Sequence, residues 1–454
     1  MTALMTRHAL RRIPIRAMLA AAVLLPSLSL IPAYAAPPPV NVDRSSTPQA
    51  IKATTERIFA EDFARHQAGL PPATGGGRND CASVKADRKR RGIQGCTRPS
   101  TPAEINRPAI DAMLAEIDAE QAAQPAQPAP EPAPGEPVTA NGLAPATGAN
   151  NPPRSTACPY DGLRYDGRMD ACQIYNFTHT VLDRQVNGDV VIGEAYFTVV
   201  EWTLLSNTRR GWDHHIVVRI NGGWGAAQNG MNVYTIVKCT VAGCNVDLDI
   251  PANGWVFMPL FQNWHGVSQL SSIKNPTDYS SQNAFIWSYS PAGGRAARSE
   301  TQFFDEVRCD AVAYIVSAGC AYWRQPGYFK LAVSDSTVDS SARFIRDAQI
   351  KLPTHPGVLG WVGLNRAAPL TIDANRKAVE PACKALKGNI QGYDCDEYPF
   401  ASTNQGAASG TQGVNWQIAL VDPSDNQKAG ALLSGFYARN RMWYGDHFYV
   451  QISP

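Results

Sequence analysis

The most informative part of this sequence reads GYDCDEYPFA at residues 392–401. It places three carboxylates, Asp394, Asp396 and Glu397, within four positions around Cys395. Like charges this close repel one another unless a cation neutralises them, and carboxylate oxygens suit hard divalent ions. On an extended segment Asp394 and Asp396 would share a face, whereas Glu397 would point to the other side unless the chain turns. The segment is therefore either a metal-dependent site or a solvated acidic loop.

The residues around this block predict an α+β domain over 301–454. A short apolar run predicts a buried strand at 312–316, and helical spacing predicts helices at 340–350, 374–386 and 426–441. A closing strand is predicted at 444–452, where the Gly445-Asp446 turn precedes most of its apolar residues. About 150 residues are enough for one hydrophobic core.

Residues 156–300 predict an all-β unit, either a sandwich or a barrel. Apolar and polar residues alternate at 196–202, 216–220 and 233–237, and Asn187-Gly188 and Asn221-Gly222 are hairpin-turn signals. The unit also contains several tryptophans, which either belong to its core or line a glycan- or cell-wall-binding surface: Trp202, Trp212, Trp224, Trp255, Trp264 and Trp287.

The N-terminal third predicts export and no large core. Residues 1–35 combine four arginines, an apolar run at 18–30 and the small-x-small site Ala33-Tyr34-Ala35, which is typical of a secretory signal peptide. Residues 36–155 are rich in Pro and Ala, with short helices predicted near 51–63 and around Ile110 and Ile117. Such a composition predicts a pro-region or a tether. No later segment is apolar enough to span a bilayer.

Ten cysteines indicate a disulfide framework. They fall in five successive close pairs without the C-x-x-C spacing of zinc sites, and pairing of neighbours is the simplest arrangement, although spacing alone does not fix it. In order they are Cys81, Cys96, Cys158, Cys172, Cys239, Cys244, Cys309, Cys320, Cys383 and Cys395.

Several motifs together resemble the NucA/NucB deoxyribonuclease family, in its disulfide-containing branch. The block extends to GYDCDEYPFAST at 392–403, followed by a glycine-rich stretch at 405–413 and the pair Asp425-Asn426. The chain then continues with FYARNR at 436–441 and GDHFYVQI at 445–452. Upstream, VRCDAVAYIVSAGC at 307–320 and PLTIDANRKAV at 369–379 are also similar to that branch. The resemblance covers roughly 305–453.

This resemblance implies a secreted, sequence-nonspecific endonuclease with a ββα-metal fold, which cleaves DNA with one Mg2+ or Mn2+ ion. A carboxylate must replace the histidine base of many relatives, and we favour Glu397, with Asp396 orienting it or joining the metal shell. Asn426 is the implied direct metal ligand, with Asp425 close by and Asp394 on the strand. Which of Asp396 and Glu397 is the base stays open.

The cation that meets the phosphate is a second open point. Family members without this disulfide often carry arginine where Cys395 stands, so another group must replace it. Arg439 is our candidate, with Arg376 and Arg441 as alternatives. A net charge of +2 is compatible with local phosphate contacts, and no base-reading helix or zinc finger is recognisable.

The histidines offer weaker alternatives. His447 and His355 are isolated in the sequence, so each is a less favoured base. In Asp213-His214-His215, adjacent side chains on a strand would point to opposite faces, which favours a structural or surface role over shared metal binding.

Two other functions compete with the nuclease. The aromatic β unit motivates a cell-surface or glycan-binding protein with an inactive nuclease-like domain. A secreted hydrolase acting on peptides or sugars is the third, although adjacent carboxylates are poor geometry for a glycosidase pair. The metal, the choice between DNA and RNA, the ligand of the β unit, the fate of the N-terminal region and the biological role stay open.

Overall fold

The structure is a computed structural model of the whole chain. It describes residues 41–42, 81–86, 91–123, 158–160, 162–239, 244–248, 256–272, 277–280, 282–301, 304–312, 314–315, 317–388 and 390–454. The predicted signal peptide, the helix expected near 51–63 and the Pro/Ala-rich segment at 125–137 lie outside these residues.

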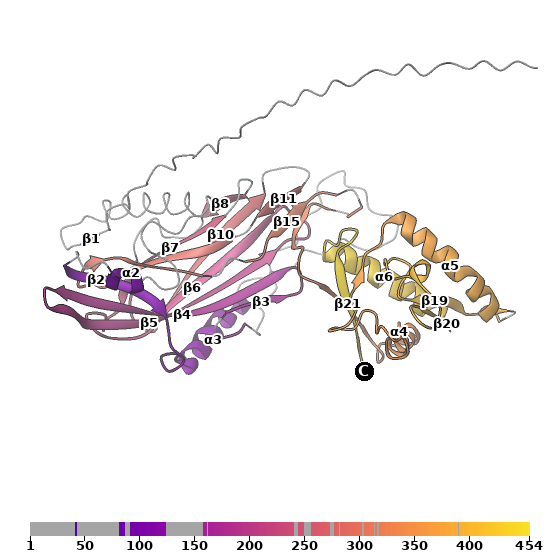
Figure 1. Cartoon of the computed structure of the whole chain (residues 1–454), viewed down its shortest axis with the longest axis horizontal. Coiled ribbons are helices and arrows are strands. Elements are labelled where there is room, and N and C mark those ends of the chain that lie inside the picture. The colour runs from indigo at the N-terminus through magenta and orange to yellow at the C-terminus, as the bar shows by residue number, and fades with distance from the viewer. Residues whose placement is uncertain are drawn as a thin grey trace, which may run out of the picture. The chain divides into compact units, whose positions relative to one another are not determined.

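A large sheet forms most of the β-rich region, and its long strands lie side by side in Figure 1. Within the described residues it has nine strands: in spatial order β1 (Asn41–Val42), β13 (Gly294–Arg295), β2 (Gly92–Pro99), β4 (Asp170–Gln185), β5 (Gly188–Leu205), β6 (Gly211–Gly225), β10 (Asn263–Ser272) and β8 (Cys244–Leu248), with β3 (Gly162–Asp166) paired to β4.

Two smaller sheets pack against this one. They consist of β14 (Ala297–Glu300), β12 (Gln282–Tyr289), β7 (Met231–Cys239) and β9 (Val256–Met258), and of β11 (Thr277–Ser280), β15 (Val307–Asp310) and β16 (Gly319–Tyr322). One buried cluster joins Val199 and Val218 of the large sheet to Ile286 and Val307 of the smaller ones. The predicted all-β middle region is therefore confirmed as a multi-sheet structure.

The two hairpin-turn signals of this region have different outcomes. Asn187-Gly188 does connect β4 to β5, where Gln185 pairs with Gly188. The prediction of a turn at Asn221-Gly222 is wrong, because both residues lie inside β6. There the register against β5 shifts, and the Asn221 amide donates to Thr198 Oγ1 at 2.6 Å in the sheet interior. A β-bulge, like a turn, favours residues with a flexible backbone such as glycine, so the same two residues are compatible with either structure.

The Asp213-His214-His215 run confirms the predicted alternation of faces. His214 Nε2 lies 3.1 Å from a Glu201 carboxylate oxygen on one side of the sheet. On the other side, His215 stacks on Trp202 with ring centroids 4.6 Å apart. Both histidines therefore have structural partners on different faces. Trp202 and Trp212 are buried, so neither lines a ligand-binding surface.

Residues 81–86 and 91–123 are part of the β-rich structure, which differs from the tether that their composition predicted. Strand β2 pairs with β4, and α2 (Cys81–Ala86) is joined to β2 by the Cys81–Cys96 disulfide. Helix α3 (Arg107–Ala123) buries Ile110 and Ile117 against the large sheet, as the helical spacing of these residues predicted. The sequence did not predict the pairing of β2 with β4 because the two strands are far apart along the chain.

Four disulfides are present among the described residues: Cys81–Cys96, Cys158–Cys172, Cys309–Cys320 and Cys383–Cys395. All four join neighbours in the cysteine sequence, which was the simplest arrangement. The side chains of Cys239 and Cys244 lie outside the described residues. No helix in the described part of the chain is long and apolar enough to cross a membrane.

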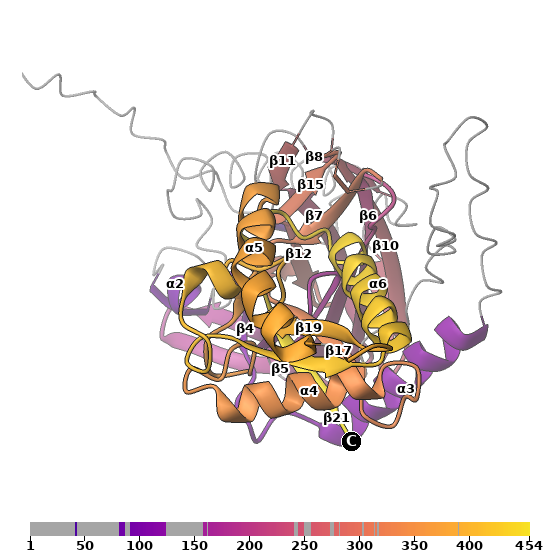
Figure 2. The same ribbon diagram turned by 90° about the vertical axis from the view of Figure 1, so that its right-hand side faces the viewer.

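The C-terminal region is α+β, as predicted, and Figure 2 shows its helices around its strands. Its three-stranded sheet contains β17 (Gly327–Ala332), β21 (His447–Ser453) and β18 (Leu364–Asn365), and a separate two-stranded sheet contains β19 (Asp394–Tyr398) and β20 (Gln417–Val421). The helices are α4 (Asp339–Lys351), α5 (Pro369–Lys387), the short 3-10 helix η1 (Ala407–Ser409) and α6 (Pro423–Arg439). Phe329, Ile345, Phe436 and Phe448 form part of one core.

The predicted strand at 312–316 is wrong. The described residues of this segment form a turn between β15 and β16, and the Cys309–Cys320 disulfide closes the loop. Phe304, Val307 and Tyr322 belong to the core of the β-rich region, although they lie beyond the domain boundary expected at residue 300. Apolar residues in a short run do not by themselves distinguish a strand from a buried loop.

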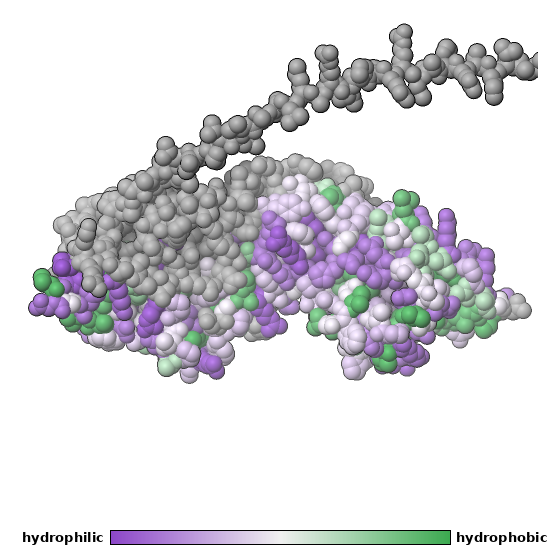
Figure 3. Space-filling view, viewed as in Figure 1, coloured by the Kyte–Doolittle hydropathy of each residue, from purple (hydrophilic) through white to green (hydrophobic). Residues whose placement is uncertain are grey.

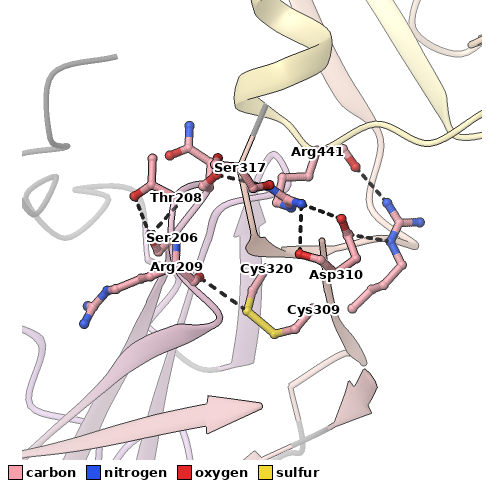
Figure 4. Close-up of a disulfide and its surroundings, with 10 residues drawn as sticks. Ser206, Thr208, Arg209, Cys309, Asp310, Ser317, Cys320 and Arg441 are labelled. Carbon is pink, nitrogen blue, oxygen red and sulfur yellow. Dashed lines mark hydrogen bonds and ion pairs between the residues drawn. A yellow bond between two sulfur atoms is a disulfide. The ribbon is translucent and has the colours of Figure 1, made fainter. Parts of the chain in front are cut away.

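Buried ion pairs connect this loop to the C-terminal region (Figure 4). The Arg441 guanidinium donates to the Asp310 carboxylate and, at 2.7 Å, to the Ser317 carbonyl oxygen. Asp446 accepts hydrogen bonds from Arg168 at 2.5 Å and from Arg308 at 2.9 Å. These ion pairs, together with the pair between Arg308 and Asp310 on β15, form one charge cluster that joins the β-rich and α+β regions.

His179 supports a prediction about acid stability. Burial lowers its pKa from 6.5 to about 3, so the folded protein holds it neutral, between Thr97 and Ser288. The unfolded chain binds a proton below pH 6.5 and the folded chain does not, so this contribution to stability is lost as the pH falls through 6.5. From pH 7 to pH 5, wild type is expected to lose about 2 kcal/mol relative to a His179→Asn variant in urea unfolding. A pH-independent difference would contradict this.

Candidate active site

The candidate site lies on two antiparallel strands that are followed directly by a helix. Strand β19 carries the three carboxylates, and β20 pairs with it so that Asp394 lies opposite Val421 and Glu397 opposite Ile418. Helix α6 begins at Pro423, two residues after β20 ends. The start of β19 and the N-terminal end of α6 are therefore neighbours.

The two faces of β19 have different neighbours. Cys395 is joined to Cys383 of α5, and Ile418, the register partner of Glu397, packs in the same small cluster beneath α5. On the opposite face the Tyr398 hydroxyl accepts from Gln349 of α4 at 3.1 Å. Alternation along the strand then places Asp394 and Asp396 on the α4 face and Glu397 on the α5 face.

Asp396 is a half-buried carboxyl whose pKa is raised from 3.8 to about 7. Burial is the main cause, and the Glu397 carboxylate adds to it by repulsion. The Glu397 backbone N–H, which donates to Asp396 Oδ1 at 2.9 Å, and the Ser341 hydroxyl act in the opposite direction. Without a cation, this carboxyl is therefore poised between its two protonation states near neutral pH.

Glu397 occupies a different environment. Burial raises its pKa, whereas the Ala401 backbone N–H and the charge of Arg376 lower it. Arg376 is exposed on α5, so it approaches the strand from the α5 side. The structure thus brings Glu397 together with Arg376, and not with the residues at the start of α6.

The N-terminal end of α6 lies beside that of α4. Asp422 caps α6 by accepting the Ser424 N–H at 2.8 Å, and its own N–H donates to the Ser340 hydroxyl at 3.2 Å. Asp425 is buried and accepts the Ser340 N–H at 2.9 Å, so it caps α4. Asn426 is half-buried on the next position of α6. Helix N-termini attract carboxylates and other anions.

The loop after β19 is held by a residue that the sequence did not single out. The Asn375 amide of α5 donates to the carbonyl oxygens of Ala401 and Thr403, both at 2.8 Å, and accepts the Ala408 N–H at 3.0 Å. Gly406 packs so closely on this amide that a Cβ there would clash with it. A buried amide with three backbone bonds fixes the course of the glycine-rich loop.

The three candidate arginines lie in three different places. Arg376 is beside Glu397, as described. Arg439 is exposed at the last turn of α6, about 20 Å along the helix from Asn426 at 1.5 Å per residue. Arg441 is fully buried in its pair with Asp310, so this alternative for the phosphate contact is wrong.

The two isolated histidines have structural surroundings. His355 Nδ1 lies 2.6 Å from the Gln349 carbonyl oxygen, and its ring packs against exposed Trp361. His447 lies on β21 opposite Asn365, and burial lowers its pKa. Neither approaches β19 through a contact that the structure shows.

The surface of the C-terminal region is mixed. On the face shown in Figure 3, hydrophobic and hydrophilic residues are interspersed over this region. Among the described residues, no group of three or more His, Cys, Asp or Glu side chains is gathered into a ready-made metal cluster. An ion at this site would therefore take further oxygen ligands from amides, water or substrate.

Comparison with known proteins identifies the C-terminal part of the chain. Residues 368–451 match the deoxyribonuclease NucA/NucB family, which confirms the resemblance for this segment, including β19, β20 and α6. This segment is thus similar to the NucA/NucB deoxyribonuclease domain over these residues. No curated protein matches the chain in a sequence search.

Proposed function

We propose that this chain is a secreted, metal-dependent endonuclease that hydrolyses DNA phosphodiester bonds without sequence preference. The observation that carries the proposal is the succession β19, β20, α6 inside the matched segment, with carboxylates on the first strand and Asn426 in the first turn of the helix. This order of elements and residue types is the one expected of a ββα-metal nuclease.

Geometry favours Asp396 as the general base, in place of Glu397, which the sequence favoured. Asp396 shares its face of β19 with Asp394 and lies on the side of the α4 N-terminus, which Asp425 of α6 caps. Glu397 is on the other face with Arg376. A base must reach the water that attacks the phosphorus, so it must lie on the face where the ion and the phosphate bind.

The residues at the start of α6 fit a hard divalent ion, because their donors are all oxygens. Asn426, Asp425 and Asp394 would hold it, with Asp425 fixed by its bond to the Ser340 N–H. When bound, the ion would polarise the phosphate and stabilise the leaving oxygen. The chain's own part is to take a proton from water at Asp396. Because Arg376 lies on the Glu397 face and Arg439 at the far end of α6, these two candidates would contact flanking phosphates of the DNA and not the cleaved one.

The four disulfides support a function outside the reducing cytoplasm. We propose that residues 1–35 direct export and that the C-terminal α+β region carries catalysis. The β-rich part, which includes β2 and α3 and extends past residue 300 to β16, then acts chiefly as a scaffold, because its loop between β15 and β16 holds Arg441.

Metal dependence gives a direct test. Purified protein is expected to nick supercoiled plasmid in Mg2+ or Mn2+, to lose this activity in EDTA and to regain it when excess metal is added. An Asp396→Asn preparation made in parallel controls for contaminating nucleases. Cleavage that continues unchanged in EDTA would contradict the proposal.

A further inference from the structure

Arg366 is a half-buried cation without a carboxylate in ion-pair contact, and the charge of Asp446 acts on it only from a greater distance. In the described part of the chain it takes part in no ion pair, and its NH1 group donates only to the Met442 carbonyl oxygen. Three other buried arginines, Arg168, Arg308 and Arg441, each pair with an aspartate. A cation removed from water costs free energy unless an anion accompanies it. Arg366 is therefore suited to an anionic ligand.

Three tyrosines surround this guanidinium. Its central carbon lies 4.8 Å from the ring centre of Tyr437, 5.1 Å from that of Tyr314 and 5.3 Å from that of Tyr444. These distances allow cation–π attraction, which holds the charge in place without supplying a counter-charge. The pKa of Arg366 is lowered by burial, but the group remains a cation at neutral pH.

Two of these tyrosines form an exposed stack. The rings of Tyr314 and Tyr444 lie 4.3 Å apart at an interplanar angle of 15°, and they are 39% and 37% exposed. Tyr314 belongs to the loop that the Cys309–Cys320 disulfide and Arg441 hold in place. The outer face of this stack is a preformed surface for another flat ring, next to a positive charge.

The loop that follows β19 connects this cluster to the candidate site, and the cluster itself lies near the C-terminal end of α6, about 16 Å along the helix from Asn426. Arg366 forms a backbone bridge with Thr403, and the Tyr437 hydroxyl is 2.9 Å from that of Ser402. Ser402 and Thr403 lie directly after Ala401, whose N–H supports Glu397. Arg366 and Tyr314 both lie outside the segment that matches the nuclease family.

We propose that Arg366, Tyr314 and Tyr444 form a DNA-binding subsite, in which Arg366 binds a phosphate of the bound strand away from the cleaved bond and the tyrosine stack receives an unpaired base. The subsite rests on the proposed nuclease function and names the form of DNA that it takes: a segment with at least one unstacked nucleotide. A guanidinium is a strong partner for phosphate, and aromatic rings stack on any base without reading its sequence.

The phosphate contact is tested by binding in EDTA, with fluorescently labelled single-stranded oligonucleotides. Arg366→Gln is expected to weaken binding about tenfold at 0.1 M salt and to reduce the slope of log affinity against log salt by about 0.7. Arg324→Gln is the matched control, because Arg324 also packs on an aromatic ring, Trp323, but has Glu306 as its partner. Equal binding by both variants would overturn the phosphate contact.

The base contact is tested with Tyr444→Ala and with an oligonucleotide that lacks its bases. Tyr444→Ala removes the ring on which the base stacks. This change is expected to weaken binding of the normal oligonucleotide by about 5- to 150-fold, and binding of the abasic oligonucleotide far less. Tyr444→Phe should bind as wild type does, because it keeps the ring. An equal loss on both oligonucleotides would show that Tyr444 only supports the fold, and would overturn the stacking proposal.

Plasmid cleavage by the wild-type protein separates the two proposals. If it cuts plasmid and Arg366→Gln binds DNA normally, the subsite is wrong and the nuclease stands. If DNA binding depends on Arg366 but no metal supports cleavage, the nuclease proposal fails and the subsite stands.

Discussion

An Asp396→Asn variant is expected to cleave DNA about 10²- to 10⁴-fold more slowly than the wild-type protein. Asparagine has the same shape as aspartate, but it cannot accept a proton from the attacking water. Asp396 is half-buried on the face of β19 towards the start of α4, where the ion and the phosphate are proposed to bind. The substitution is therefore expected to reduce the cleavage rate directly. Initial rates of plasmid nicking in saturating Mg2+ measure it, and an unchanged thermal unfolding midpoint shows that the fold is intact.

Glu397→Gln is the matched comparison. Because Glu397 faces α5 and Arg376, its replacement is expected to slow cleavage less than tenfold. The reverse result, with Glu397→Gln inactive and Asp396→Asn active, would restore the assignment that the sequence favoured. Full activity in both variants would remove β19 from the catalytic centre.

The second large effect concerns stability. An Arg441→Met variant is expected to lower the free energy of unfolding by about 3 kcal/mol, because it leaves the buried Asp310 carboxylate with only the longer ion pair to Arg308 at 3.5 Å. The same change removes the hydrogen bond to the Ser317 carbonyl oxygen, so the loop that carries Tyr314 also loses support. Urea unfolding followed by tryptophan fluorescence measures the change.

A double variant separates the ion pair from simple packing. Arg441→Met combined with Asp310→Leu removes this pair and leaves Arg168 and Arg308 to share Asp446, so a double-mutant cycle that includes both single variants measures the coupling between Arg441 and Asp310. A loss below 1 kcal/mol in the single variant would mean that Arg308 neutralises Asp310 without Arg441.

Patterns in the sequence correctly predicted the features that depend only on residues close together in the chain. Periodicity within a single element predicts the three C-terminal helices and the opposite faces of His214 and His215. The turn at Asn187-Gly188 follows from its two residue types. The placement of Asp396 and Glu397 on opposite faces of β19 also follows from alternation. The choice of Asp396 over Glu397 as the base depends on which helix, α4 or α5, covers each face of β19, and the sequence did not predict this.

What the sequence did not predict depends on partners far along the chain. Strand β2 was hidden because its partner, β4, begins more than seventy residues later. Asn221-Gly222 carries a turn signal, but the neighbouring strand uses it for a bulge. Arg366 has no motif around it, and its lack of a carboxylate partner is visible only when its neighbours in space are known.

The Cys383–Cys395 bond places a covalent link inside β19, between Asp394 and Asp396. Closing a loop of this length restricts the unfolded chain by about 3 kcal/mol. A newly made chain with free thiols lacks this restraint at the strand that carries Asp394, Asp396 and Glu397. Under the proposed function, oxidation would therefore act as a maturation step, which would tie the completion of a DNA-degrading centre to a compartment separate from the genome of the producing cell.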